Sequence, residues 1–201
     1  MALISNVLSL VSADKAFTLL PHRGRIRIDV RVDAKQTIPE IGVGSFTDRN
    51  GNVEIAIDVK RGDLRPTLET WIPASVAHEL HHSSRIRTGP GYGVTLGDAL
   101  VSEGLADHFV FEVFPRTPSQ PWDHALTTAQ ERALWLVARR ELNIRLGYDR
   151  QQWFFGSGKI PRWAGYTLGY DIVAAYLHHH RSASDAVGVD ATKVIAPFRG
   201  F

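Results

Sequence analysis

The chain has 201 residues, with 23 basic and 21 acidic side chains and a formal net charge of +2. This length suits one domain with a sizeable core. The nearly balanced charge, with no basic run interleaved with aromatic residues, argues against a nucleic-acid-binding surface. The chain has no cysteine, so disulfides and thiolate ligands are excluded, and any metal must be held by histidines and carboxylates.

The N-terminal segment predicts an amphipathic helix over residues 3–20, because Ile4, Val7, Leu8 and Val11 follow helical spacing. This segment lacks the basic start and the long apolar run of a secretory signal. No stretch of the sequence approaches the apolar length of a membrane span. We therefore expect no membrane partner and a cytoplasmic location.

Three short segments before residue 60 predict strands. Apolar residues alternate with polar ones over 25–33 and over 53–59. A shorter apolar segment at 41–46 is joined to the last of these by turn-forming residues at 48–52. We expect a small antiparallel sheet. Its free edge would offer hydrogen bonds to an extended peptide, but a sheet that only covers the next helix explains the pattern equally well.

A helix is predicted over residues 73–87. Pro73 suits a first helical turn, where its missing N–H costs nothing, and a Gly-Pro-Gly sequence at 89–91 ends the helix. Val76, Leu80 and Ile86 supply its apolar positions.

This helix carries the most informative motif of the chain, His-Glu-Leu-His-His at residues 78–82, which is an H-E-x-x-H pentapeptide. His78 and His82 are four residues apart and share one helical face. Their imidazoles can hold one zinc ion while Glu79 stays free to act as a base. The alternative is a pair of ordinary helix histidines, and we interpret His81 as a flanking or pocket residue.

A catalytic zinc site needs a third protein ligand and an open position for water. Glu103 is the next strong candidate, on a second predicted helix that begins near Thr95 or Asp98 after a glycine-rich loop and ends before Pro115. Asp107 lies four residues later on the same face. A carboxylate there can accept the second N–H of a zinc-bound histidine and fix its orientation. A solvated carboxylate is the alternative for Glu103.

This combination of H-E-x-x-H with E-x-x-x-D about twenty residues later resembles the gluzincin metallopeptidases, the thermolysin-like clan. The sequences His-Glu-Leu-His-His and Ser-Glu-Gly-Leu-Ala look closer still to a bacterial family described as predicted zinc-dependent proteases. The resemblance covers about residues 40–180 and is strongest at 75–109 and 165–170. It implies that His78, His82 and Glu103 hold zinc, that Glu79 is the general base, and that Asp107 is the partner of His78.

Peptide hydrolysis also needs a donor that stabilises the developing oxyanion. Tyr166 and Tyr170, four residues apart at the start of a predicted helix, are the best candidates for this catalytic role. Packing against the core is the alternative for both, and His108 and His124 are weaker candidates.

The remaining C-terminal sequence predicts helices. Thr128 and Glu131 have the spacing of a capping box for a helix that ends near Leu146. Its apolar positions predict a stripe that faces the core: Leu134, Val137, Ala138, Leu142 and Ile144. The three histidines at 178–180 point in different directions on a helix and cannot chelate one ion well.

Together these features predict a single α+β, zincin-like domain over 1–201. A small antiparallel sheet and the active-site helix would form an N-terminal lobe at about 1–88, packed against a mostly helical C-terminal lobe at about 89–201. The expected function is a zinc-dependent metallopeptidase with Zn²⁺ as cofactor and a peptide or protein as substrate. A non-catalytic zinc-stabilised binding module and a zinc hydrolase of non-peptide amides or esters remain open.

Overall fold

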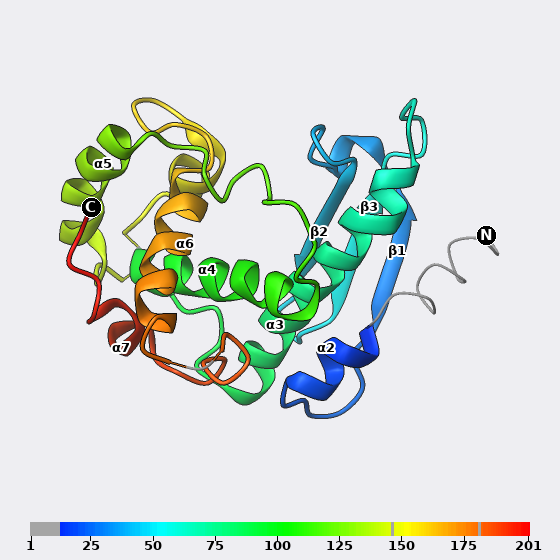
Figure 1. Cartoon of the computed structure of the whole chain (residues 1–201), viewed down its shortest axis with the longest axis horizontal. Coiled ribbons are helices and arrows are strands. Elements are labelled where there is room, and N and C mark those ends of the chain that lie inside the picture. The colour runs from blue at the N-terminus through cyan, green and yellow to red at the C-terminus, as the bar shows by residue number, and fades with distance from the viewer. Residues whose placement is uncertain (1–12, 146, 181) are drawn as a thin grey trace. The chain divides into compact units, whose positions relative to one another are not determined.

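The predicted strands form one three-stranded sheet, shown in the computed structural model of Figure 1. The strands are β1 (Ile28–Val32), β2 (Val43–Thr47) and β3 (Val53–Ile57), in the order β1-β3-β2. The central strand, β3, is the most deeply buried, as expected for a strand that has a neighbour on both sides. Two strands therefore remain at the edges, β1 and β2.

The structure describes residues 13–145, 147–180 and 182–201. They divide into two compact units: one holds the described residues up to Gly91 with Phe109–Thr117, and the other holds Tyr92–His108 with the described residues from Pro118 onward. Of the helix expected over 3–20, only α2 (Ala13–Leu19) falls among the described residues. Within the described part of the chain, no helix combines the length and apolar character needed to cross a bilayer.

The hairpin predicted at residues 48–52 is present between β2 and β3, which are antiparallel. The Asp48 carboxylate accepts the backbone N–H groups of Asn50 and Asn52, both at 2.8 Å. Gly51 has a φ of 75°, a left-handed conformation that glycine adopts without strain. The turn chemistry read from the sequence is therefore confirmed.

The expectation of a wholly antiparallel sheet is wrong for β1, which pairs with β3 in parallel from Ile28↔Val53 to Val32↔Ile57. Strands that follow one another usually pair, but here residues 33–42 carry the chain past the position of β3 to the opposite edge. The chain then returns through the hairpin, so β3 runs in the same direction as β1. This crossover contains a short 3-10 helix, η1 (Ala34–Gln36), and an isolated bridge from Ile38 to Val43, and it leaves no strong signal in the sequence.

The motif helix, α3 (Ile72–Thr88), follows a π-helical segment, η2 (Thr67–Trp71), and has Pro73 in its first turn as predicted. It packs on β2 and β3, and most of its side chains from Ala74 to Arg85 are buried. Polar groups on α3 bind the hairpin: the Ser83 hydroxyl donates to the Gly51 carbonyl at 2.6 Å, and Arg87 donates to the Asn52 side chain at 3.2 Å. These bonds fix the helix to the strands.

The second predicted helix is α4 (Leu96–Val113). Its first turn is stabilised by a reciprocal pair, because the Thr95 hydroxyl accepts the Asp98 N–H while the Asp98 carboxylate accepts the Thr95 N–H, both at 3.1 Å. The helix ends before Pro115, as the sequence predicts.

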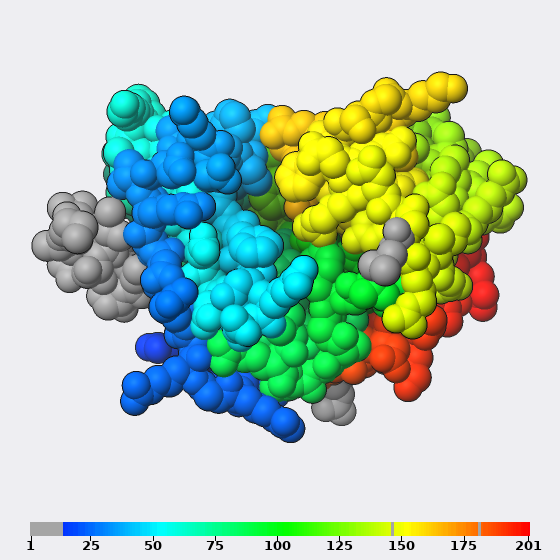
Figure 2. Space-filling view, turned by 180° about the vertical axis from the view of Figure 1, so that it is seen from behind, coloured from blue at the N-terminus to red at the C-terminus, as the bar shows by residue number. Residues whose placement is uncertain are grey.

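The later helices are α5 (Thr128–Glu141), the π-helical η3 (Gln151–Gly156), α6 (Ala164–Leu177) and α7 (Ala191–Ile195). The predicted capping box of α5 is wrong by one residue, because Thr127 and Gln130 form it. Thr127 has the extended backbone of an N-cap residue, so Thr128 is already the first helical residue. In Figure 2, residues around η3, coloured yellow, form part of the surface, and Phe155 there is 49% exposed.

The core-facing stripe expected on α5 is also only partly correct. Ala138 is fully buried, but Val137 is 42% exposed and Ile144, beyond the helix, is 48% exposed. The helix packs on α6, and Ala138 is the buried residue of α5. Helical spacing alone overestimates how much of an apolar face is covered.

Helices α4 and α6 approach each other closely at Gly104 and Gly169. A Cβ atom at Gly104 would lie 2.2 Å from the Gly169 carbonyl oxygen, and one at Gly169 would lie 2.3 Å from the Leu100 carbonyl oxygen. No side chain fits at either position, so both glycines are required by packing. Gly104 directly follows Glu103, which makes this crossing part of what positions that carboxylate.

Candidate metal centre

Helix α3 brings His78 and His82 together as their spacing predicts. Their Nε2 atoms are 3.0 Å apart, and the rings meet edge to face with centroids 4.7 Å apart. Both side chains are buried, at 7% and 5% exposure. Two nitrogen ligands of one tetrahedral zinc ion stand about 3.3 Å apart, since each lies about 2.0–2.1 Å from the metal. The pair therefore has a separation suited to a shared ion.

Within the described residues, His78, His82 and Glu103 form a group of buried side chains whose ligand atoms all lie within 4.8 Å of one another. Two imidazoles and one carboxylate are a donor set that zinc prefers, and three protein ligands leave a fourth position for water. The residues thus fit the ion that the motif implies. His81 is fully buried, packs against the Phe109 ring at 5.5 Å and is not part of this group, in agreement with its interpretation as a flanking residue.

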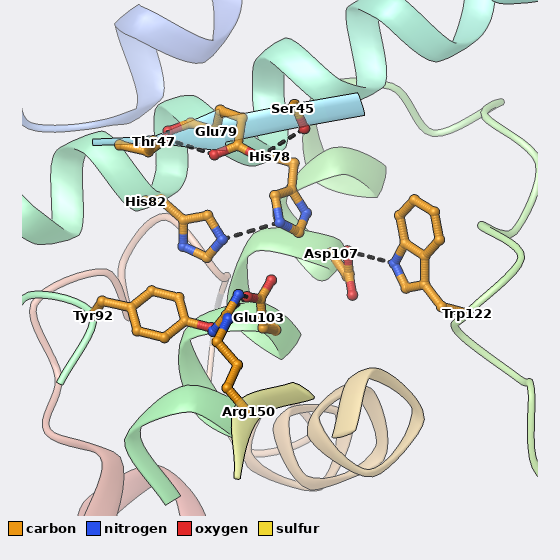
Figure 3. Close-up of polar contacts among 10 residues, drawn as sticks. All are labelled: Ser45, Thr47, His78, Glu79, His82, Tyr92, Glu103, Asp107, Trp122 and Arg150. Carbon is orange, nitrogen blue, oxygen red and sulfur yellow. Dashed lines mark hydrogen bonds and ion pairs between the residues drawn. The ribbon is translucent and has the colours of Figure 1, made fainter. Parts of the chain in front are cut away.

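The carboxylate of Glu79 is held by two hydroxyl groups from strand β2 (Figure 3). Ser45 donates to Oε1 at 2.7 Å, and Thr47 donates to Oε2 at 2.6 Å. Glu79 is only 4% exposed. Ser45 and Thr47 were not among the candidate residues of the sequence. Their signal is two hydroxyl residues at alternate positions on one face of a predicted strand.

Two polar side chains that no sequence pattern indicated bond to Glu103. Tyr92 donates to Oε1 at 2.5 Å, and Arg150 donates to the same oxygen at 3.1 Å. Arg150 also donates to the Tyr92 hydroxyl, and its guanidinium lies over the Tyr92 and Phe154 rings at 4.7 and 5.0 Å. Tyr92 precedes α4 and Arg150 precedes η3, so no local sequence pattern connects them to Glu103.

Electrostatics keep both partners of Glu103 protonated. Burial and the Glu103 charge raise the pKa of Tyr92 well above its usual value. Burial alone would lower the pKa of Arg150, but the interactions with Tyr92 and Glu103 raise it overall. A neutral phenol and a cation therefore face the Glu103 carboxylate.

Asp107 is fully buried, and its Oδ1 accepts the side-chain N–H groups of Gln120 at 2.9 Å and Trp122 at 3.2 Å. Both donors come from the loop after α4, where no sequence pattern indicated them. A carboxylate with two donors on one oxygen has a fixed orientation. Its predicted role as partner of His78 stays a prediction.

The two predicted oxyanion donors on α6 have different surroundings. The Tyr166 ring packs edge to face on Phe154, with centroids 5.0 Å apart, and contributes to the raised pKa of Arg150. The Tyr170 ring stacks on His108 at 4.1 Å. Burial, followed by Asp123 and Asp107, raises the pKa of Tyr170 to about 12. Tyr170 is therefore protonated at neutral pH.

The chain belongs to the family described as "Predicted Zn-dependent protease (DUF2268)", whose model matches residues 28–196. The match includes both histidines of the motif, Glu79 and Glu103. This membership agrees with the resemblance to a bacterial family of predicted zinc-dependent proteases.

Two curated relatives are both uncharacterized proteins of Bacillus subtilis (strain 168). YjaZ is 32% identical over 126 residues, which cover 60% of this chain and 48% of the relative. YjfC is 28% identical over 138 residues, which cover 62% of this chain and 46% of the relative. The matched part thus spans about half the length of each relative. No solved structure matches the chain significantly.

Proposed function

We propose that this chain is a zinc-dependent metallopeptidase of gluzincin type, with a zincin-like fold, in which His78, His82 and Glu103 hold the ion. The observation that carries the proposal is the buried group formed by these three side chains, with Glu79 between the two histidines on α3. When bound, zinc would polarise a carbonyl and lower the pKa of a coordinated water to about 7.

Glu79 would serve as the general base and then as the general acid. It would take a proton from the attacking water and pass it to the leaving amine. A purely structural metal site has no need of such a group and normally closes its fourth position with a protein ligand. The buried carboxylate beside His78 therefore favours catalysis over a binding module.

Tyr166 and Tyr170 remain the proposed oxyanion donors. Burial raises the pKa of Tyr170 to about 12, so this residue keeps a phenol proton to donate. Asp107, held by Gln120 and Trp122, would orient His78 through its second ring nitrogen.

An extended peptide is the substrate that best suits the edge strand β2. In an antiparallel pair, bonded and non-bonded residue pairs alternate. The Asp48 backbone N–H donates to the Asn52 carbonyl, so the alternation makes Phe46 and Gly44 the residues of β2 that bond to β3 through their main chains. The main-chain groups of Ser45 and Thr47 therefore point to the outer edge of the sheet. Among the described residues no further main-chain hydrogen bond occupies Ser45 or Thr47. Pairing through the main chain binds peptides with little sequence preference.

A mixed peptide library incubated with the zinc-loaded protein tests the proposal. We expect cleavage that a chelator abolishes. Glu79→Gln should lose turnover and keep its zinc, because the amide cannot accept the proton but leaves the three ligands in place. A protein that binds zinc yet cleaves neither peptides nor small amides and esters would be a binding module. Cleavage of small amides or esters alone would indicate a different hydrolase.

A further inference from the structure

We propose that Ser45 and Thr47 are positioning residues that hold the Glu79 carboxylate in its working orientation, so that the edge strand β2 fixes the base. This inference rests on the proposed function, because it assigns a role to two residues that act through Glu79.

Ser45 Oγ donates to Oε1 at 2.7 Å, and Thr47 Oγ1 lies 2.6 Å from Oε2, so each carboxylate oxygen has a hydroxyl within hydrogen-bond distance (Figure 3). Thr47 Oγ1 also lies 3.0 Å from the Glu79 carbonyl oxygen, but the nearer, charged Oε2 is the stronger acceptor for its single proton. Hydroxyl bonds to an ionised carboxylate are typically about 2.5–2.7 Å long. One bond to each oxygen fixes the plane of the carboxyl group, which a single bond would leave free to rotate.

The base also needs these donors because it is buried. At 4% exposure Glu79 has little access to solvent, and a buried carboxylate without hydrogen bonds is costly. An ionised carboxylate has about four acceptor positions on its two oxygens. The two hydroxyls therefore leave room for a water to donate, so the same contacts that hold the carboxylate do not block its use as a base.

Ser45 and Thr47 both lie on β2, which is an edge strand of the sheet. Their side chains face Glu79, while their main-chain groups point to the outer edge of the sheet. A peptide paired with that edge would be bound by the residues that hold the base. The same two residues would then set the position of the substrate and the orientation of Glu79.

The test compares substitutions that remove or keep each hydroxyl. Thr47→Val and Ser45→Ala remove one donor each, whereas Thr47→Ser and Ser45→Thr keep it. Thr37→Val is the matched control, because it removes a hydroxyl that bonds to the Ala34 carbonyl away from Glu79. The measurements are kcat and KM on a cleaved library peptide, zinc affinity by chelator competition, and thermal unfolding.

We expect Thr47→Val and Ser45→Ala to lower kcat by about 10-fold or more, the usual effect of losing a group that orients a site residue. KM and zinc affinity should change by less than about twofold, because the substrate edge uses main-chain groups and the metal ligands are untouched. The hydroxyl-keeping variants should recover most of the kcat that Thr47→Val and Ser45→Ala lose, and Thr37→Val should retain the wild-type kcat.

Two results would overturn the inference: an unchanged kcat in Thr47→Val and Ser45→Ala, or an equal loss in Thr47→Ser. If the valine or alanine variant does not fold, Thr47→Ser and Ser45→Thr are compared with the wild type for kcat alone, and a loss there refutes the role of the hydroxyl. A double variant, Thr47→Val in Glu79→Gln, should lose no further turnover, because the hydroxyl acts only through the base.

The proposed function fails separately from this inference. A wild-type protein that binds zinc without any chelator-sensitive cleavage refutes the peptidase and the positioning role together. An active wild type whose Thr47 and Ser45 variants match it refutes the positioning role alone.

Discussion

Tyr166 and Tyr170 lie one helical turn apart on α6, yet they have different neighbours. The Tyr166 ring packs on Phe154, and the Arg150 guanidinium that bonds to Glu103 lies over that same Phe154 ring. Tyr170 instead stacks on His108. This difference favours Tyr166 as the donor to a reacting carbonyl.

We expect Tyr166→Phe to lower kcat by about 100-fold, the effect of losing one oxyanion donor. Tyr170→Phe removes the same atom one turn away and serves as the matched comparison, with a loss of less than about tenfold. Steady-state kinetics on a cleaved peptide measures both. A larger loss in Tyr170→Phe would reverse the assignment.

Asp171, also on α6, predicts a pH dependence of stability. Burial and the nearby Glu131 raise the pKa of Asp171 from 3.8 to about 7. Because the folded protein prefers the neutral acid, stability is highest below the unfolded pKa and falls as pH rises from about 4 towards 7. Asp171→Asn should remove this part of the decline, as measured by denaturant unfolding at several pH values. A decline equally steep in the variant would show that other groups cause it.

The sequence identified the residues whose partners are close along the chain. The spacing of His78 and His82 on one helix fixes their geometry, and Glu103 follows from the E-x-x-x-D pattern of the resemblance. Ser45 and Thr47 were missed because their contact with Glu79 depends on how a strand registers against a helix more than thirty residues later. Tyr92 and Arg150 were missed for the same reason, since 58 positions separate them in the sequence.

At the scale of elements, the crossing of α4 and α6 depends on two glycines. We expect Gly104→Ala to lower the free energy of unfolding by about 1–3 kcal/mol, because the new methyl group would overlap the Gly169 carbonyl. Gly188→Ala is the control, because a Cβ atom there meets nothing within 4 Å. Denaturant unfolding measures the stability of both variants. Equal stability would contradict the claim that the close crossing of α4 and α6 requires glycine at position 104.

Element boundaries show where sequence patterns stop being informative. The turn at 48–52, Pro73 and the end of α4 were all predicted, because turn and cap residues act locally. The parallel pairing of β1 was not, since it depends on a ten-residue connection whose path is decided by packing. The exposed Val137 has the same explanation: periodicity indicates an apolar face but not which part of it is covered.

For the whole molecule, zinc should act as a stabilising ligand of the folded chain. The three proposed ligands converge only in the folded state, so zinc at about 100 times its Kd should raise the free energy of unfolding by about 2.7 kcal/mol. A chelator should reverse this shift in thermal melts. His82→Ala should abolish the response, while His179→Ala, in the exposed histidine tract, should keep it. A response retained in His82→Ala would place the ion elsewhere.

The bonds from Ser83 and Arg87 to the hairpin tie α3 to the strands on either side of that turn. These segments should therefore open together, as one cooperative unit in amide hydrogen exchange. When warming opens strand β2, helix α3 should unfold with it, and His78 and His82 would no longer be held together. Loss of zinc and loss of slow exchange in residues 43–57 should follow a single temperature curve.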